Sequence, residues 1–231
     1  MKFCQKGSLC DLLANDYKIQ KQLYYKWLGE IAEGMNYFHL EKNIIHRDLK
    51  PEHILLNDKD VIKLSGFSFC RELKEEYSET MTTCGTYAYM APEVMRRDRT
   101  SKKVDVFSYG VVAWEMLTTV RPYAGLKPND LLRRIPNGEL KLPIPDKAPE
   151  TVKKVLKRCM HLNPDCRPSF QRILEILGKQ AVVWFLYFIS TFFFKTFNLF
   201  RKSQKSHRVR RRSGGIKYAS GKKIQKSRWN H

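Results

Sequence analysis

"NIIHRDLKPEHILLNDKDVIKLSGF", residues 43–67, holds the patterns that decide the fold of this chain. Two short apolar runs within it, 54–56 and 61–64, flank the polar residues 57–60. Short apolar runs separated by turn-forming residues are typical of paired strands. This stretch therefore predicts a small hairpin, preceded by the charged triplet at 46–48.

Helices are expected on both sides of the hairpin. Apolar residues before it recur at spacings of three and four, as in an amphipathic helix; they are Tyr24, Trp27, Leu28, Ile31, Met35 and Phe38. The segment 105–118 is apolar on most faces, which predicts a helix buried nearly all round. Further helices are expected over 150–162 and 169–177, separated by a proline. The predicted fold class is mainly α with a small β-hairpin.

The composition changes after Gly178, and we place a domain boundary there. The chain has 231 residues and is 42% apolar, which is enough for one sizeable core, assigned to 1–178. Residues 179–200 form an aromatic-rich hydrophobic segment. Residues 201–231 carry twelve Lys or Arg and no Asp or Glu. A tail of this kind is expected to be disordered and to attract polyanions.

Three relations between this end of the chain and a membrane stay open. The uncharged run 181–194 is shorter than the ~20 residues of a spanning helix, and spanning would carry the basic tail across. An aromatic segment lying in the interface, beside a basic cluster attracted to anionic lipid, meets both constraints. The third is an untranslated or disordered extension with no membrane role.

The expected compartment is the cytoplasm, with membrane association as an option. The six cysteines form no CxxC pair and no metal-ligand spacing with histidine, which fits a reducing compartment and predicts no metal site. No specific nucleic-acid partner is expected.

Asp48 and Lys50 carry the most specific chemical signal. Phosphoryl transfer needs a carboxylate that orients and deprotonates the attacking hydroxyl, and a nearby lysine that steadies the γ-phosphate. Taken alone, the triplet at 46–48 is equally well explained as a charged loop with one buried pair.

Four further stretches join this triplet in a recognisable order, and with them the chain resembles a eukaryotic protein kinase over 1–178. "HRDLKPEHILL" (46–56) is similar to the catalytic loop, "KLSGFSF" (63–69) to the metal-binding turn, "GTYAYMAPE" (85–93) to the end of the activation segment, "KVDVFSYGVVAWEMLT" (103–118) to the central buried helix, and "NPDCRPSF" (163–170) to the late Arg-Pro signature. The resemblance implies the large, C-terminal lobe of a kinase, with the small lobe absent.

Finer features resemble one group of serine/threonine kinases. Lys50, and Thr86 within 85–93, are typical of serine/threonine rather than tyrosine kinases. "MKFCQKGSLCDLL" (1–13) and "LKLPIPDKAP" (140–149) look closest to the dual-leucine-zipper and mixed-lineage mitogen-activated protein kinase kinase kinases. This implies protein partners in a stress-kinase cascade.

The resemblance also implies roles for individual residues. The catalytic candidates are Asp48, Lys50 and Thr86. The nucleotide-site candidates are Phe3 and Cys4 of the hinge, Leu55, His53 and Gly66. The structural candidates are His46, Phe67, Glu93, Asp105 and Arg167; Asp105 would brace the catalytic loop, and Glu93 would form a buried ion pair with Arg167.

Regulation is expected in the stretch that corresponds to the activation segment. Its hydroxyl residues are Ser78, Thr80, Thr82 and Thr83. Such residues are often only turn formers, but a phosphate on Thr82 or Thr83 would pair with Arg47 and order the segment.

The chain departs from the family's pattern where the metal should bind. Gly66 replaces the metal-binding aspartate, and His53 replaces the asparagine that holds another magnesium ion. Magnesium prefers oxygen ligands, so both protein ligands are lost. A GxGxxG loop and a VAIK-type lysine are also missing, and Met1 aligns with the opening of the interlobe hinge. The expectation is a truncated longer protein, with an alternative start as the other explanation.

These features predict three alternative functions. The first is a pseudokinase that works through protein partners and needs no cofactor. The second is an active serine/threonine kinase that uses ATP and Mg²⁺, with its small lobe missing only from this sequence. The third is a membrane-associated adaptor that acts through its tail.

Overall fold

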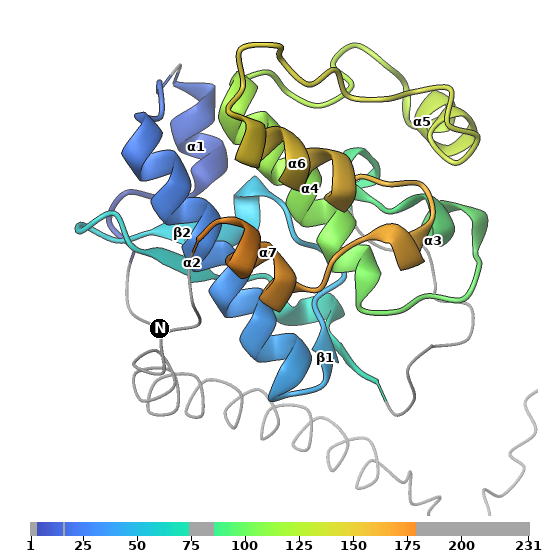
Figure 1. The fold of residues 1–231 in the computed structure, drawn as a ribbon, viewed down its shortest axis with the longest axis horizontal. Helices are drawn as coiled ribbons and strands as arrows, with labels where there is room; N and C mark the ends of the chain where they lie inside the picture. Colours follow the sequence, from blue (N-terminus) through green and yellow to red (C-terminus); the bar gives the residue numbers. More distant parts are fainter. Residues whose placement is uncertain (1–3, 16, 74–85, 179–231) are drawn as a thin grey trace, which may run out of the picture. The chain divides into compact units, whose positions relative to one another are not determined.

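The structure is a computed structural model, and it describes residues 4–15, 17–73 and 86–178 (Figure 1). Within these ranges it contains seven α-helices and two two-stranded sheets, so the helix-rich fold class is confirmed. The helices are α1 Leu9–Ala14, α2 Lys21–Leu40, α3 Pro92–Arg96, α4 Lys103–Thr118, α5 Pro128–Arg134, α6 Glu150–Cys159 and α7 Phe170–Ile176. The strands are β1 Ile44–Ile45, β2 Ile54–Leu56, β3 Ile62–Leu64 and β4 Arg71–Glu72.

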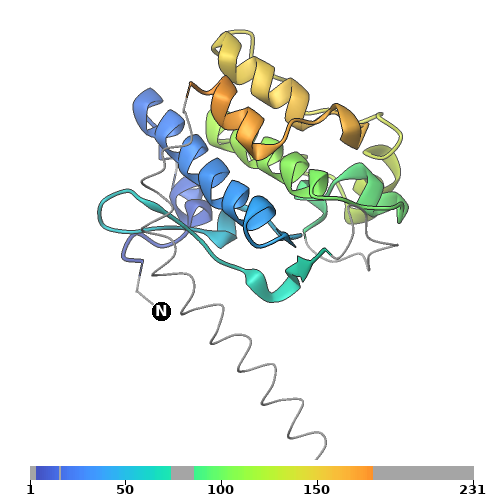
Figure 2. The same cartoon turned by 60° about the horizontal axis from the view of Figure 1, so that its bottom comes forward.

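Helix α2 confirms the amphipathic pattern before the hairpin. All six apolar residues of that pattern are buried, and Trp27, Leu28, Ile31 and Met35 are fully inaccessible. Burial of each such side chain contributes about 1.5–3 kcal/mol relative to exposure. Helix α7 packs along α2, as both ribbon views show (Figure 2).

Helix α4 runs through the core, and its buried character is also confirmed. Every residue from Val104 to Met116 is buried. The hydroxyl of Tyr24 on α2 donates to the Ala113 carbonyl at 2.9 Å, which links the two helices. Gly110 lets α6 approach closely, because a Cβ there would lie 2.8 Å from the Cβ of Cys159.

The predicted hairpin is confirmed in its strands and its turn. Strands β2 and β3 are antiparallel, with Ile54 opposite Leu64 and Leu56 opposite Ile62. The Asn57 side chain accepts hydrogen bonds from the N–H groups of Lys59 and Val61 at 3.0 and 2.9 Å. An asparagine bonding to backbone two residues on is a common way to close a turn. Val61 therefore belongs to the turn rather than to the second strand.

A second two-stranded sheet and three short helices were not predicted. Strands β1 and β4 pair antiparallel, with Ile44 opposite Glu72. Helices α1, α3 and α5 have five to seven residues each, too short for a clear period. Helix α6 ends at Cys159, three residues before the expected end at 162.

Several predictions fall outside the described residues. They concern Phe3, the hydroxyl residues Ser78, Thr80, Thr82 and Thr83, and the segments 179–200 and 201–231. Across the part of the chain that is described, no helix combines the length and apolar character required to cross a bilayer.

Candidate functional site

The loop that follows β1 is held from below by the buried carboxylate of Asp105 on α4. This carboxylate accepts the backbone N–H groups of His46 and Arg47, each at 2.8 Å, and the Nε2–H of His39 at 2.8 Å. Burial opposes its ionisation, yet the hydrogen bonds from His39 and from the Arg47 N–H keep the pKa of Asp105 below its usual range. The carboxylate stays charged and fixes the loop, including Arg47 with its φ of +71°.

His46 is locked into one tautomer inside the same loop. Its Nε2 lies 2.8 Å from the Ser65 carbonyl, which can only accept, so Nε2 carries the hydrogen. Its Nδ1 accepts the backbone N–H of Asp48 at 3.3 Å. Burial lowers the pKa of His46, in agreement with a neutral ring. Phe67 packs on this ring, with centroids 5.3 Å apart.

Asp48, Lys50 and Thr86 meet in space although they come from separate segments. The ammonium group of Lys50 lies 3.1 Å from Oδ2 of Asp48 and donates to the Thr86 hydroxyl at 2.9 Å. Asp48 is 6% exposed, so the ion pair is shielded from water. The three candidate catalytic residues therefore form one cluster, with the lysine bridging carboxylate and hydroxyl.

His53 approaches the same carboxylate oxygen of Asp48 as Lys50 does. Its Nδ1 lies 2.7 Å from the backbone carbonyl of Asp48 and 3.3 Å from Oδ2. Since a carbonyl only accepts, Nδ1 donates, and Nε2 of a neutral ring is left as an acceptor. The residue at the asparagine position thus packs against Asp48 through an imidazole.

Gly66 gives His53 the room it occupies. A Cβ at position 66 would lie 2.3 Å from both Cγ and Nδ1 of the imidazole, closer than real Cβ atoms come to any neighbour. Gly66 also has a φ of +78°, which side chains rarely adopt. The Ser65 N–H and hydroxyl both donate to the His53 carbonyl, at 2.8 and 3.1 Å, and tie the two segments together.

Glu93 and Arg167 form a buried two-point ion pair. The guanidinium donates to the two carboxylate oxygens at 2.6 and 2.8 Å. Its remaining N–H groups donate to the carbonyls of Lys103, His161 and Leu162. Every donor of Arg167 is used, as burial of a charge requires.

The remaining nucleotide-site candidates, Cys4 and Leu55, lie near the hairpin, and Phe3 is outside the described residues. Leu55 is half-buried in β2, and the segment from Cys4 to Gly7 runs beside this strand, with the Lys6 N–H donating to the Leu56 carbonyl at 3.2 Å. Within the described ranges no group of three metal-ligating side chains occurs.

Sequence reasoning missed His39 as a partner of Asp105. Its signal was a polar residue directly after the apolar stripe of α2, next to Phe38. It also missed a buried acidic group on α4: Glu115 accepts the Tyr89 hydroxyl at 2.7 Å. Burial raises the pKa of Glu115 to about 7.

Several known proteins are similar to this chain in sequence. Mitogen-activated protein kinase kinase kinase dlk-1 of Caenorhabditis elegans is 40% identical over 175 residues, which cover 76% of this chain and 19% of that protein. Mitogen-activated protein kinase kinase kinase 12 of Rattus norvegicus is 41% identical over 174 residues, covering 75% and 19%. Mitogen-activated protein kinase kinase kinase 13 of Homo sapiens is 40% identical over 174 residues, covering 75% and 18%.

The chain thus spans about a fifth of the length of these relatives. The family described as "Protein tyrosine and serine/threonine kinase" matches residues 1–177. This chain belongs to the protein tyrosine and serine/threonine kinase family, and it resembles mitogen-activated protein kinase kinase kinases within it.

Proposed function

We propose that this chain is the large lobe of a kinase of mitogen-activated protein kinase kinase kinase type, that its phosphoryl transfer is impaired, and that it acts in a stress-kinase cascade through protein partners. One observation carries the proposal: the His53 imidazole fills the volume that any side chain at position 66 would need. The loss of a carboxylate at 66 and the presence of a ring at 53 therefore support each other.

The described residues around Asp48 do not fit a magnesium ion. Magnesium requires near-octahedral oxygen ligands at about 2.0–2.1 Å. Gly66 offers no side chain, His53 offers a nitrogen that suits softer metals, and the Asp48 carboxylate is engaged by Lys50. One carboxylate in an ion pair is a poor substitute for the two missing oxygen ligands.

A second candidate is an active serine/threonine kinase, with ATP and Mg²⁺ as cofactors. The cluster of Asp48, Lys50 and Thr86 favours it, because the lysine already holds the carboxylate and the hydroxyl together. In this function Asp48 would take the proton of the attacking hydroxyl, and Lys50 would steady the transferred phosphate. Metal ligands would then have to come mainly from nucleotide phosphates and water.

A thermal-shift titration of the full chain separates the two candidates. ATP is added with magnesium in one series and with EDTA in the other, and phosphate incorporation into a generic kinase substrate is measured in parallel. A ligand at 100 times its dissociation constant stabilises a fold by about 2.7 kcal/mol. We expect no magnesium-dependent stabilisation and no phosphate transfer. If both appear, the impaired function is wrong and the active kinase is correct.

We further propose a cytoplasmic site of action, with 179–200 and 201–231 as a peripheral attachment to anionic membranes. The composition of these segments supports this proposal. Flotation of the full chain with phosphatidylserine vesicles tests it. Binding that high salt releases supports interfacial attachment, binding that survives salt and carbonate means that the segment spans, and no flotation rules out a membrane role.

A further inference from the structure

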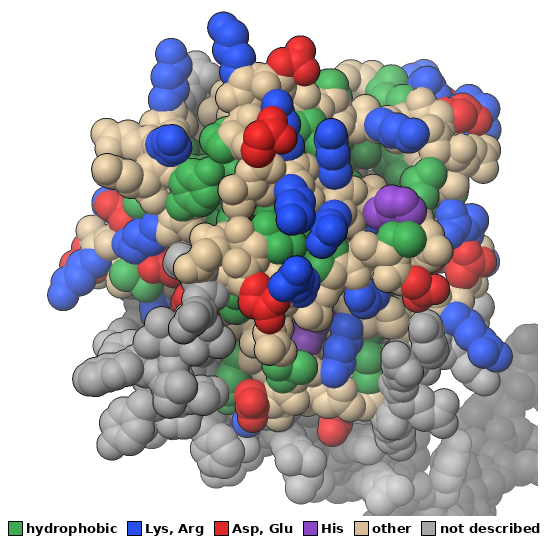
Figure 3. All heavy atoms as spheres, in the orientation of Figure 1, with side chains coloured by type: hydrophobic (Ala, Val, Ile, Leu, Met, Phe, Trp, Pro, Cys, Tyr) green, Lys and Arg blue, Asp and Glu red, His purple; other side chains and the backbone are tan. Residues whose placement is uncertain are grey.

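A basic groove lies between α6 and α7, far along the chain from the catalytic loop. It has a volume of about 690 Å³. Figure 3 shows Lys and Arg side chains gathered over the middle of this face, where Figure 1 places the two helices. The groove is open to solvent rather than enclosed, so it suits a segment lying along the surface better than a buried small molecule.

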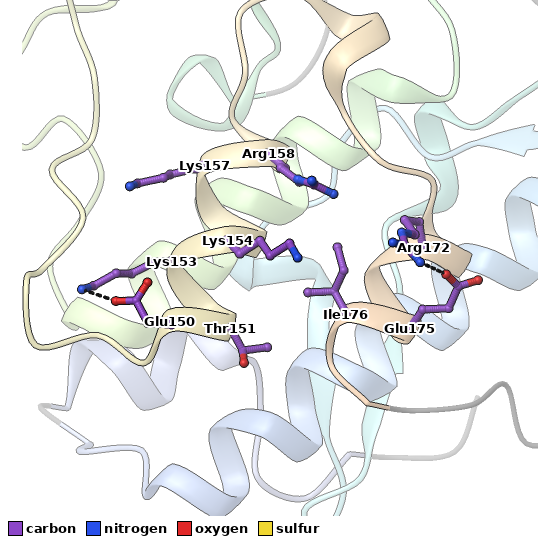
Figure 4. A pocket seen from close by; sticks show the side chains of 9 residues that line it. All are labelled: Glu150, Thr151, Lys153, Lys154, Lys157, Arg158, Arg172, Glu175 and Ile176. Carbon is purple, nitrogen blue, oxygen red and sulfur yellow. Dashed lines mark hydrogen bonds and ion pairs between the residues drawn. The ribbon is translucent and has the colours of Figure 1, made fainter.

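Three cations converge on this groove. Lys154 and Arg158 point from α6 towards α7, where Arg172 and Ile176 stand on the opposite wall (Figure 4). Lys154 and Arg158 are exposed, and among the described residues neither has an ion-pair partner. Arg172 is paired with Glu175 on its own helix.

The placement of Lys154 and Arg158 lowers the stability of α6 slightly without serving the fold. Like charges four residues apart on a helix face each other and destabilise it by about 0.2–0.5 kcal/mol. Lys153 on the same helix is neutralised by an acidic neighbour, since the Glu150 carboxylate lies 2.7 Å from its ammonium group. No such carboxylate serves Lys154 and Arg158 within the described ranges, so their charge is available to a partner.

The groove suits a short acidic segment better than an extended polyanion. Glu150 and Glu175 also line it, each paired with a cation of its own helix, so the face is not uniformly basic as a surface for a bilayer or a nucleic-acid backbone would be. Ile176 on the α7 wall adds an apolar contact that a peptide side chain can use. A peptide that ends its acidic stretch within the groove avoids both carboxylates.

The spacing of the cations defines the pattern of the partner. Four residues of helix separate Lys154 from Arg158 by about 6 Å along the axis. Alternate side chains of an extended strand are about 6.6 Å apart and point to the same side. Carboxylates at positions i and i+2 of an extended peptide therefore match the two cations.

We propose that the groove between α6 and α7 is a docking site for an extended acidic segment of a partner protein, with Asp or Glu at alternate positions. The chain's own residues 201–231 are unsuitable occupants because they contain no acidic residue. This site does not depend on whether the chain transfers phosphate.

Fluorescence anisotropy with a labelled peptide of alternating Glu and Ser tests the proposal on the full chain. Lys154→Glu with Arg158→Glu is compared with Lys127→Glu plus Lys141→Glu, which makes the same change in net charge at exposed positions outside the groove. Both variants keep the basic tail, so its contribution to peptide binding is the same in each. A neutral version, Lys154→Gln with Arg158→Gln, serves if the reversed charges disturb folding, and thermal melts check each protein.

We expect the groove variant to weaken peptide binding by about tenfold or more, and the control pair to change it by less than about twofold. Equal losses in the two variants would assign the binding to overall charge, and unchanged binding in both would assign it to the tail; either result overturns the proposal. If the groove variant loses flotation with phosphatidylserine vesicles but keeps peptide binding, the groove faces a membrane and the proposal is also wrong.

Discussion

Replacing Gly66 by aspartate should destabilise the fold unless His53 is replaced as well. Two costs add up at position 66. A side chain at a φ of +78° costs about 1–2 kcal/mol. Forcing a Cβ to within 2.3 Å of the His53 ring adds overpacking of about 1–3 kcal/mol. Gly66→Asp should therefore lower the free energy of unfolding by about 2–5 kcal/mol.

His53→Asn removes the second cost but not the first. The smaller side chain vacates the space beside position 66, while loss of the imidazole–carbonyl hydrogen bond costs about 1 kcal/mol on its own. In the double variant the overpacking disappears, so the two substitutions should couple favourably by about 1–3 kcal/mol. Urea unfolding of the four full-length proteins measures this double-mutant cycle.

Gly125 provides a matched control for the backbone term. Its φ is +81°, and a Cβ there would meet nothing within 4 Å. Gly125→Asp thus reports the cost of the left-handed conformation alone. The reasoning is refuted if Gly66→Asp is no more harmful than Gly125→Asp, or if the costs of the His53 and Gly66 substitutions are simply additive.

Three further substitutions test other parts of the core. Glu115 has an ordinary pKa of 4.5 and a folded pKa of about 7, so the fold favours its protonated form. Its contribution to stability is therefore present below pH 4.5 and is lost as the pH rises to 7. The free energy of unfolding lost over this window is about 3 kcal/mol. The stability difference between the natural protein and Glu115→Gln should follow this window in urea melts at several pH values, and a difference that does not vary with pH would contradict it. Arg167→Ala should cost about 3–5 kcal/mol because it strands the buried Glu93 carboxylate, whereas Arg96→Ala, at an exposed pair, should cost less than about 1 kcal/mol; equal losses would contradict the role of burial. Asp105→Asn should cost about 1.5–3 kcal/mol and speed hydrogen exchange of the amides at 46 and 47, and unchanged exchange would show that the carboxylate does not hold the loop.

The sequence predicted those elements whose burial leaves a continuous pattern. Helix α4 could be predicted because Val104 to Met116 are all buried and apolar residues dominate the segment. Helix α2 could be predicted because its apolar stripe keeps a helical period. Strand β4 was unreadable, since Arg71 and Glu72 are both exposed and two residues show no alternation. The pairing of β1 with β4 is set by the path of the chain on either side, which no local pattern encodes.

The site shows a different limit, because spacing along the chain says nothing about which departures touch. His53 and Gly66 are thirteen positions apart and read as two separate losses of a metal ligand. In space they are one packing arrangement, because the His53 ring fits only when position 66 carries no side chain. If oxygen ligands are introduced at positions 53 and 66, the order of the two substitutions therefore matters. Replacing His53 first opens space and creates no clash, whereas replacing Gly66 first drives a side chain into the imidazole, so only a path that begins at His53 is unobstructed.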